Sequence, residues 1–240
     1  MLSDTMKRKI VLPIIAIAVV ALVSFGIYYV NDFYHAGNVA QKYLNGTDEV
    51  SVIEIDRGLF LDGPGNDSAV IFYPGAKVEY TAYLPLLILL SQEGIDCFLI
   101  KMPKNLALLG EDSADSIVDE YNYTHYFMSG HSLGGVVASK YVHKSNDIDG
   151  LILLEAYSTD KIDEPVLSIY ASEDKVMNLK TYNESLHFIS DNLTEVVIDG
   201  GNHAQVGDYG VQSGDGKAKI SPESQQKQTA DAIVEFIDGF

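Results

Sequence analysis

The chain begins with one long apolar run, and shorter apolar segments follow it at intervals. From Ile10 to Val30 the sequence IVLPIIAIAVVALVSFGIYYV contains 21 residues and no charge. As a helix this run would be about 31 Å long, which matches a hydrocarbon core of roughly 30 Å. It has no polar face, so a buried core helix is a poor interpretation. The run therefore predicts a membrane-spanning helix.

The residues on either side of this run indicate its orientation. Three basic residues at 7–9 precede it, and a pair of tyrosines ends it, as is common at a membrane interface. The positive-inside rule then predicts that residues 1–9 are a cytoplasmic basic segment and that the chain after Asn31 is exported. The alternative is a cleaved signal peptide, but its apolar region is usually roughly 7–15 residues long and ends at a small-x-small site. We therefore predict an uncleaved signal anchor over 10–30, in the cell membrane.

Beyond the anchor, the hydrophobic pattern predicts an α/β domain. Residues 31–49 place apolar side chains at helical spacing and end at Asn45-Gly46, which predicts a stalk or linker. Expected strands are 50–55, 58–62, 68–73, 95–100, 124–128, 150–154, 166–170 and 195–198. Expected helices are 79–92, 114–121, 133–144, 179–189 and 222–237. Strands that are apolar on both faces and alternate with helices predict a mostly parallel sheet with helices on both faces, over residues 50–240.

Composition and charge narrow the range of partners. The chain has 240 residues, 47% of them hydrophobic, which suits one sizeable domain. After residue 30 it has 13 basic and 33 acidic residues, a net charge of −20, which would repel nucleic acid. We therefore expect no nucleic-acid partner, and membrane contact through the N-terminal helix. The single cysteine, Cys97, lies in an apolar run and is expected in the core, and no His/Cys spacing predicts a metal.

The strongest chemical signal is the stretch GHSLGG at residues 130–135. The G-x-S-x-G pattern alone is weak evidence, but here a predicted strand precedes it and a predicted helix follows it. A turn this tight strains the backbone of Ser132, and glycines at 130 and 134 avoid side-chain clashes. The turn would expose the Ser132 hydroxyl and leave the N–H of Leu133 at a helix N-terminus, where it can bind a developing oxyanion. The pattern predicts a nucleophile elbow.

A serine nucleophile needs a base and an acid that orients the base. Of the six histidines, His203 follows the last predicted strand on a glycine-rich loop, at the sheet edge where ligands bind. His131 adjoins the serine but is expected to point elsewhere. Asp174 directly follows the strand 166–170 and is the predicted acid. Glu155, at the end of the preceding strand, is the alternative.

These motifs resemble those of the alpha/beta-hydrolase family over about residues 50–240. GHSLGG, SEDKV and GGNHAQ hold the serine, the acid and the histidine in the family's order, and YPGAKVEY is similar to its oxyanion loop. The resemblance implies that Ala76 N–H is a second oxyanion donor beside Leu133, with Lys77 as a nearby alternative. It is strongest to membrane-anchored members of the dienelactone-hydrolase-like and carboxylesterase-like branch. Dienelactone hydrolases use a cysteine nucleophile, and this chain has serine there.

Together these features predict an exported, membrane-anchored serine hydrolase that cleaves a carboxylic ester or related acyl bond of a small molecule. The Ser132, Asp174 and His203 triad would act through an acyl-enzyme, without a cofactor. One alternative is an acyltransferase that uses the same triad on a cell-envelope acceptor. Another is a catalytically silent binding protein, against which a full triad argues. The ten residues from Glu155 to Glu164 are too few for a helical cap, so no large lid and a preference for soluble esters are expected.

Overall fold

The computed structural model describes residues 4–65, 67–189 and 192–240, and only the backbone of residues 4–10 and 30. The chain divides into two compact units, Met1–Phe33 and Tyr34–Phe240. Residues 1–3 of the expected basic segment lie outside the described residues.

The first unit is a single helix, α1 (Asp4–Asn31). Its side chains from Val11 to Tyr29 are exposed and almost all apolar. By length and composition this stretch could cross a membrane, and a signal sequence near the N-terminus would have the same character. The helix is therefore a candidate membrane span or signal sequence.

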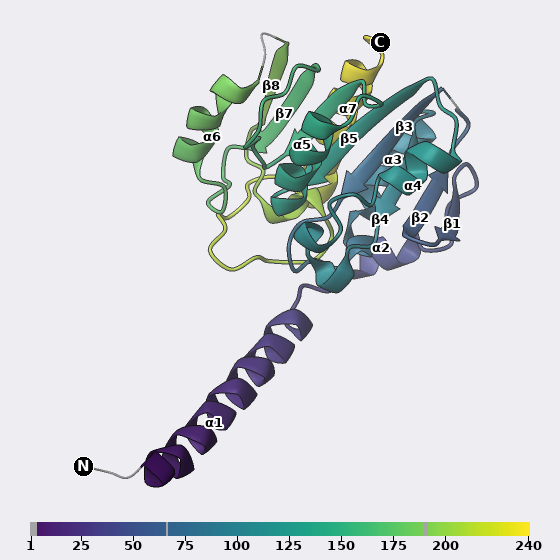
Figure 1. The fold of residues 1–240 in the computed structure, drawn as a ribbon. Helices are drawn as coiled ribbons and strands as arrows, with labels where there is room; N and C mark the ends of the chain where they lie inside the picture. The colour runs from purple at the N-terminus through teal and green to yellow at the C-terminus, as the bar shows by residue number, and fades with distance from the viewer. Residues whose placement is uncertain (1–3, 66, 190–191) are drawn as a thin grey trace. The chain divides into compact units, whose positions relative to one another are not determined.

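The second unit is built on one eight-stranded sheet (Figure 1). Its strands are β1 (Ser51–Ile55), β2 (Gly58–Asp62), β3 (Ser68–Tyr73), β4 (Asp96–Ile100), β5 (His125–His131), β6 (Gly150–Leu154), β7 (Val166–Ala171) and β8 (Leu193–Ile198). Its α-helices are α2 (Asn38–Lys42), α3 (Leu84–Gln92), α4 (Asp115–Glu120), α5 (Leu133–Lys144), α6 (Leu179–Ser185) and α7 (Pro222–Ile237). Single 3-10 turns are η1 (Tyr80–Tyr83), η2 (Pro103–Asn105), η3 (Ala107–Leu109), η4 (Leu186–Phe188) and η5 (Ala204–Val206).

The strand order is β1-β2-β4-β3-β5-β6-β7-β8, and every pairing from β4 to β8 is parallel. The hairpin of β1 and β2 adds two antiparallel strands at one side. Alternate residues of β3 enter two separate cores: Val70 and Phe72 join one, and Ala69, Ile71 and Tyr73 join the other. Helices α3 and α7 cover the first face, and α4 and α5 cover the second.

This architecture confirms the predicted fold class, a mostly parallel sheet with helices on both faces. The connection between β6 and β7, residues 155–165, is fully described and contains no helix, so no helical lid is inserted there. The carboxyl ends of the six parallel strands meet at one edge, where the loops after β3, β5, β6, β7 and β8 carry the predicted site residues.

Most of the segment expected as a stalk, from Tyr34 onward, belongs to the second unit. The backbone of Tyr34 pairs with the loop after β3, since Tyr34 N–H donates to Lys77 O (2.7 Å) and Glu79 N–H donates to Tyr34 O (2.9 Å). The N–H of Ala40 donates to the carboxylate of Asp208 in the loop after β8 (2.8 Å). From Tyr34 onward the segment therefore packs on two loops of the carboxyl edge.

Candidate active site

Ser132 occupies a strained turn between β5 and α5. Its φ of +53° lies in the region that L-residues rarely adopt. Its N–H donates to Leu154 O (2.9 Å), which extends the pairing with β6, and its carbonyl accepts from Val136 N–H as the first bond of α5 (3.2 Å). Bonds on both sides hold the strain, and the side chain remains partly exposed. This is the geometry of the predicted elbow.

The glycines beside Ser132 are required by close backbone contacts. A Cβ on Gly130 would lie 2.5 Å from the carbonyl carbon of Gly134, and a Cβ on Gly134 would lie 2.1 Å from Tyr73 O. Both distances are far below van der Waals contact, and the atoms met are backbone atoms that cannot move aside. The elbow therefore presses α5 against β3 and β5 so closely that only glycine fits.

His203 and Asp174 form a buried pair. The ring Nδ1 of His203 lies 2.8 Å from Asp174 Oδ2, and the two side chains are only 1% and 2% exposed. The other oxygen, Asp174 Oδ1, accepts from Val176 N–H (2.6 Å) and Met177 N–H (2.9 Å). Burial alone would raise the pKa of Asp174, but the hydrogen bonds from His203, Glu155 and Met177 outweigh it and leave that pKa well below its usual range. Asp174 is thus an ionised acceptor.

The second nitrogen of this imidazole is buried. His203 Nε2 has no hydrogen-bond partner in the described part of the chain. His203 and Ser132 both line a cavity of about 250 Å³, together with Leu133, Val136, Glu155, Ala156, Tyr157, Val176, Met177 and Asn178. A small acyl group could enter this cavity between the serine and the histidine.

Glu155, the alternative acid, follows β6 and is also buried, at 3% exposure. Its Oε2 accepts from Ala171 N–H (3.1 Å), and its carboxyl group contacts Asp174. Burial and then the neighbouring Asp174 raise the pKa of Glu155 well above its usual range. Of the two acids, Asp174 is the one that makes the hydrogen bond to His203 Nδ1, whereas Glu155 contacts Asp174.

The loop after β3 carries the residues expected to bind an oxyanion. The N–H groups of Ala76 and Leu133 have no acceptor among the described residues. In contrast, Lys77 N–H donates to Asn105 O (2.8 Å), and Lys77 has a φ of +58°. The N–H of Lys77, the alternative donor, is therefore already hydrogen-bonded to the loop after β4.

A buried chain of hydrogen bonds that the sequence did not predict joins three loops of the site. The hydroxyl of Tyr83 accepts from Gly75 N–H (3.0 Å) and lies 2.8 Å from His131 Nδ1. His131 Nε2 lies 3.1 Å from the carbonyl of His203. Because the carbonyl of His203 can only accept, Nε2 of His131 carries the hydrogen and donates to it. In a neutral imidazole Nδ1 is then the acceptor, and the Tyr83 hydroxyl donates to it. His131 points away from the elbow, as expected, and supports its neighbours.

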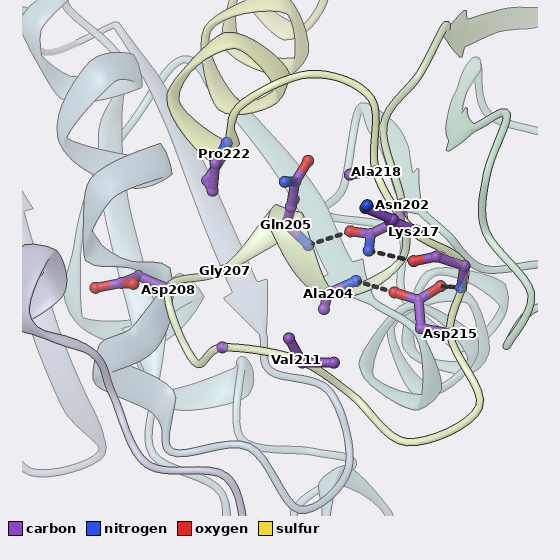
Figure 2. Close-up of a pocket in the computed structure, with 12 residues that line it drawn as sticks. Asn202, Ala204, Gln205, Gly207, Asp208, Val211, Asp215, Lys217, Ala218 and Pro222 are labelled. Atoms are coloured by element: carbon purple, nitrogen blue, oxygen red, sulfur yellow. Dashed lines mark hydrogen bonds between the residues drawn. The ribbon is translucent and has the colours of Figure 1, made fainter.

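The loop after His203 contributes a second set of supports (Figure 2). Asp215 Oδ2 accepts from Ala204 N–H (2.9 Å), and its Oδ1 accepts from Lys175 N–H (3.4 Å), so it ties the loop of His203 to that of Asp174. Asn202 donates through Nδ2 to Gly216 O (2.7 Å) and exchanges hydrogen bonds with Gln225 of α7. Four of these residues also line a second cavity of about 440 Å³, namely Asn202, Ala204, Asp215 and Gly216 (Figure 2).

The sequence places the chain in a known family. The model of the alpha/beta hydrolase family matches residues 69–227, which is more than half of the chain. The chain therefore belongs to the alpha/beta-hydrolase family, as its motifs predicted, and this membership supports a hydrolase. No curated protein matches it.

Solved structures share the fold at low sequence identity. Est1E from Butyrivibrio proteoclasticus is 16% identical, with a TM-score of 0.56 over 80% of this chain and 100% of that chain. A monoacylglycerol lipase from Paleococcus ferrophilus is 13% identical, with a TM-score of 0.57 over 71% of this chain and 96% of that one. Alpha/beta hydrolase domain-containing protein 10 from mouse is 13% identical, with a TM-score of 0.58 over 79% of this chain and 98% of that one. At these identities the likeness establishes the fold.

Proposed function

We propose that the protein is a serine hydrolase that cleaves a carboxylic ester or a related acyl bond through an acyl-enzyme. The observation that carries the proposal is the buried His203–Asp174 pair, because its histidine has an unpartnered Nε2 and lines the same cavity as the strained Ser132. A hydrogen-bonded acid and base on the same cavity as a partly exposed serine is the arrangement that nucleophilic acyl transfer requires.

The proposed reaction begins with attack of Ser132 Oγ on the substrate carbonyl carbon while His203 Nε2 takes the hydroxyl proton. The N–H groups of Leu133 and Ala76 bind the oxyanion that develops on the carbonyl oxygen. His203 then gives its proton to the leaving alcohol, which leaves the acyl group on Ser132. A water molecule, deprotonated by His203, attacks this ester and releases the acid. Asp174 stabilises the imidazolium in both halves and keeps its own charge.

The shape of the site supports a small substrate. The cavity of about 250 Å³ lies below the usual range of drug-sized sites, roughly 300–1,000 Å³, and its walls include Leu133, Val136 and Met177. No helix covers it from the connection between β6 and β7. We therefore propose short, soluble acyl esters as substrates, in preference to aggregated lipid.

We also propose that α1 anchors the enzyme in the cell membrane with its N-terminus in the cytoplasm and the hydrolase domain outside. The supporting observations are the exposed apolar stretch from Val11 to Tyr29 and the basic residues that precede it in the sequence. An anchor on the same chain would keep a small, acidic domain at the cell surface.

A membrane-impermeant fluorophosphonate probe tests both proposals in one experiment. Applied to intact cells, it should label the wild-type protein at Ser132, and Ser132→Ala should abolish labelling while the protein stays folded. Hydrolysis of 4-nitrophenyl esters should then fall steeply from acetate to longer chains. Labelling of folded Ser132→Ala would identify another nucleophile, and labelling only after lysis would place the domain inside the cell.

A further inference from the structure

Glu155 is a buried acid at the carboxyl edge for which the proposed mechanism has no task. It follows the last residue of β6, and its N–H donates to Ile169 O of β7 (2.9 Å). Its φ of +50° is unusual for a residue with a side chain. Strain of this kind costs roughly 1–3 kcal/mol and persists where surrounding contacts hold it. The fold therefore directs this side chain to a particular place.

The Glu155 side chain lies next to Asp174, the acid of the proposed triad. The Glu155 carboxyl group hydrogen-bonds Asp174, and its Oε2 accepts from the N–H of Ala171 (3.1 Å). One oxygen of each acid and one ring nitrogen of His203 all lie within 4.8 Å of one another. The three residues thus form a continuous hydrogen-bonded row.

Two carboxyl groups that share a hydrogen bond need a proton between them, and the surroundings decide which acid holds it. Asp174 accepts from three other N–H groups, those of Val176, Met177 and His203, which favour its charged form. Glu155 accepts from a single backbone N–H.

The charged groups near Glu155 act in the same direction. Asp174 and Asp215 are both acids and disfavour a second negative charge, and the buried Tyr209 also interacts with it. Burial, followed by the hydrogen bond and charge of Asp174, raises the pKa of Glu155 well above its usual range. Glu155 is therefore the protonated member of the pair, and its O–H is the donor.

We propose that Glu155 is a neutral positioning residue, which donates a hydrogen bond to the Asp174 carboxylate and fixes the direction in which Asp174 accepts from His203. The inference rests on the proposed function, because it assigns Asp174 to the triad. Glu155 keeps its proton throughout the reaction and exchanges none with His203. With the donor in place, Asp174 accepts from Glu155 as well as from three N–H groups, and these partners hold Oδ2 in its direction toward the imidazole.

The test compares Glu155→Gln with Glu155→Leu in the full-length protein. Glutamine can still donate to Asp174 and accept from Ala171, whereas leucine does neither. The measured quantities are the rate of fluorophosphonate labelling at Ser132 and kcat and KM for 4-nitrophenyl acetate. Glu155→Gln should stay within about threefold of wild type, and Glu155→Leu should lower kcat about tenfold with little change in KM. In an Asp174→Asn background Glu155→Leu should have no further effect, because the residue acts through Asp174.

A matched control separates positioning from general loss of stability. Asp96 is another buried acid, 2% exposed, which accepts from Gly63 N–H (2.9 Å) and Tyr123 O–H (2.6 Å) at the start of β4. Asp96→Leu should lower the melting temperature as Glu155→Leu does and leave kcat unchanged for the folded fraction. If Glu155→Leu does not fold, pH profiles decide: wild-type labelling should decline at alkaline pH as Glu155 ionises, and that of Glu155→Gln should not.

Three results would overturn the inference while leaving the serine mechanism standing. They are equal impairment of Glu155→Gln and Glu155→Leu, full activity of Glu155→Leu, and coincident alkaline pH profiles of wild type and Glu155→Gln. Failure of the proposed function has a different signature, because wild-type protein would then show no Ser132-dependent labelling at all.

Discussion

His203 is held from two sides, by acidic residues on one side and by neutral hydrogen-bonding groups on the other. On the side of its ring stand acids: Asp174, then Glu155, with Asp215 tying the loops together. On the side of its backbone stands a neutral chain from Gly75 through Tyr83 and His131 to the His203 carbonyl. The ring side interacts with the charge that catalysis would create. The backbone side can only fix position, since none of its groups is charged.

The two sides share one requirement, which is that a titratable group stays neutral. Glu155 must keep its proton to donate to Asp174, and His131 must remain unprotonated at Nδ1 to accept from Tyr83. Burial raises the pKa of Glu155, and burial followed by the nearby His203 lowers the pKa of His131 well below 6.5. Desolvation thus favours the neutral form in both cases, although it moves the two pKa values in opposite directions.

Of the changes considered, replacing Asp174 on the acidic side should lower activity the most. Asp174→Asn keeps the shape of the residue but removes the charge that stabilises the imidazolium, so kcat/KM should fall about 10³–10⁴-fold with little change in stability. Steady-state hydrolysis of 4-nitrophenyl acetate measures this. Asp208→Asn is the control, because Asp208 is a loop carboxylate that accepts from Ala40 N–H away from His203. A mild Asp174→Asn together with a crippling Glu155→Gln would assign the acid to the loop after β6.

Removing a hydrogen bond from the neutral side should reduce activity less than Asp174→Asn does and should reduce stability more. Tyr83→Phe leaves Gly75 N–H and His131 Nδ1 without their buried partner, which should lower the free energy of unfolding by about 1–3 kcal/mol. Since Gly75 adjoins Ala76, the oxyanion loop loosens, and kcat should fall about tenfold, less than the roughly 10²–10³ for loss of a donor.

Tyr73→Phe is a matched control for that variant. Tyr73 is equally buried, and its hydroxyl also makes two hydrogen bonds, to Glu111 O (2.7 Å) and from Ala114 N–H (2.9 Å), outside the site. It should lose comparable stability and keep its kcat. Equal loss of kcat in both variants would show that the Tyr83 hydroxyl has only a structural role.

The two sides also differ in how far the sequence could predict them. Ser132, Asp174 and His203 stand at ends of strands with strong hydrophobic patterns, and topology alone brings such ends to one edge. The strands and longer helices follow from the same patterns. Tyr83 and His131 could not be found this way, because within their apolar segments they are indistinguishable from core residues. Asp215 lies in an irregular stretch where no periodicity places it, and its partners come from two other loops.

The smallest expected effect is on the pH dependence of stability, where the two sides should show opposite signs. For Glu155 the folded-state pKa is raised, so the stability it confers is present below its ordinary value of 4.5 and declines as pH rises above it. For His131 the folded-state pKa is lowered, so its contribution is present above 6.5 and declines as pH falls below it. Each slope is at most about 1.4 kcal/mol per pH unit.

Urea unfolding of full-length protein in detergent, from pH 4.5 to 8, measures both slopes against wild type. The advantage of wild type over Glu155→Gln should shrink as pH rises through this range, because the glutamine carries no proton to lose. Its advantage over His131→Gln should shrink as pH falls below 6.5, because the glutamine cannot be protonated. Two differences that move in the same direction with pH would contradict the comparison, since one of the two groups would then be charged in the folded protein.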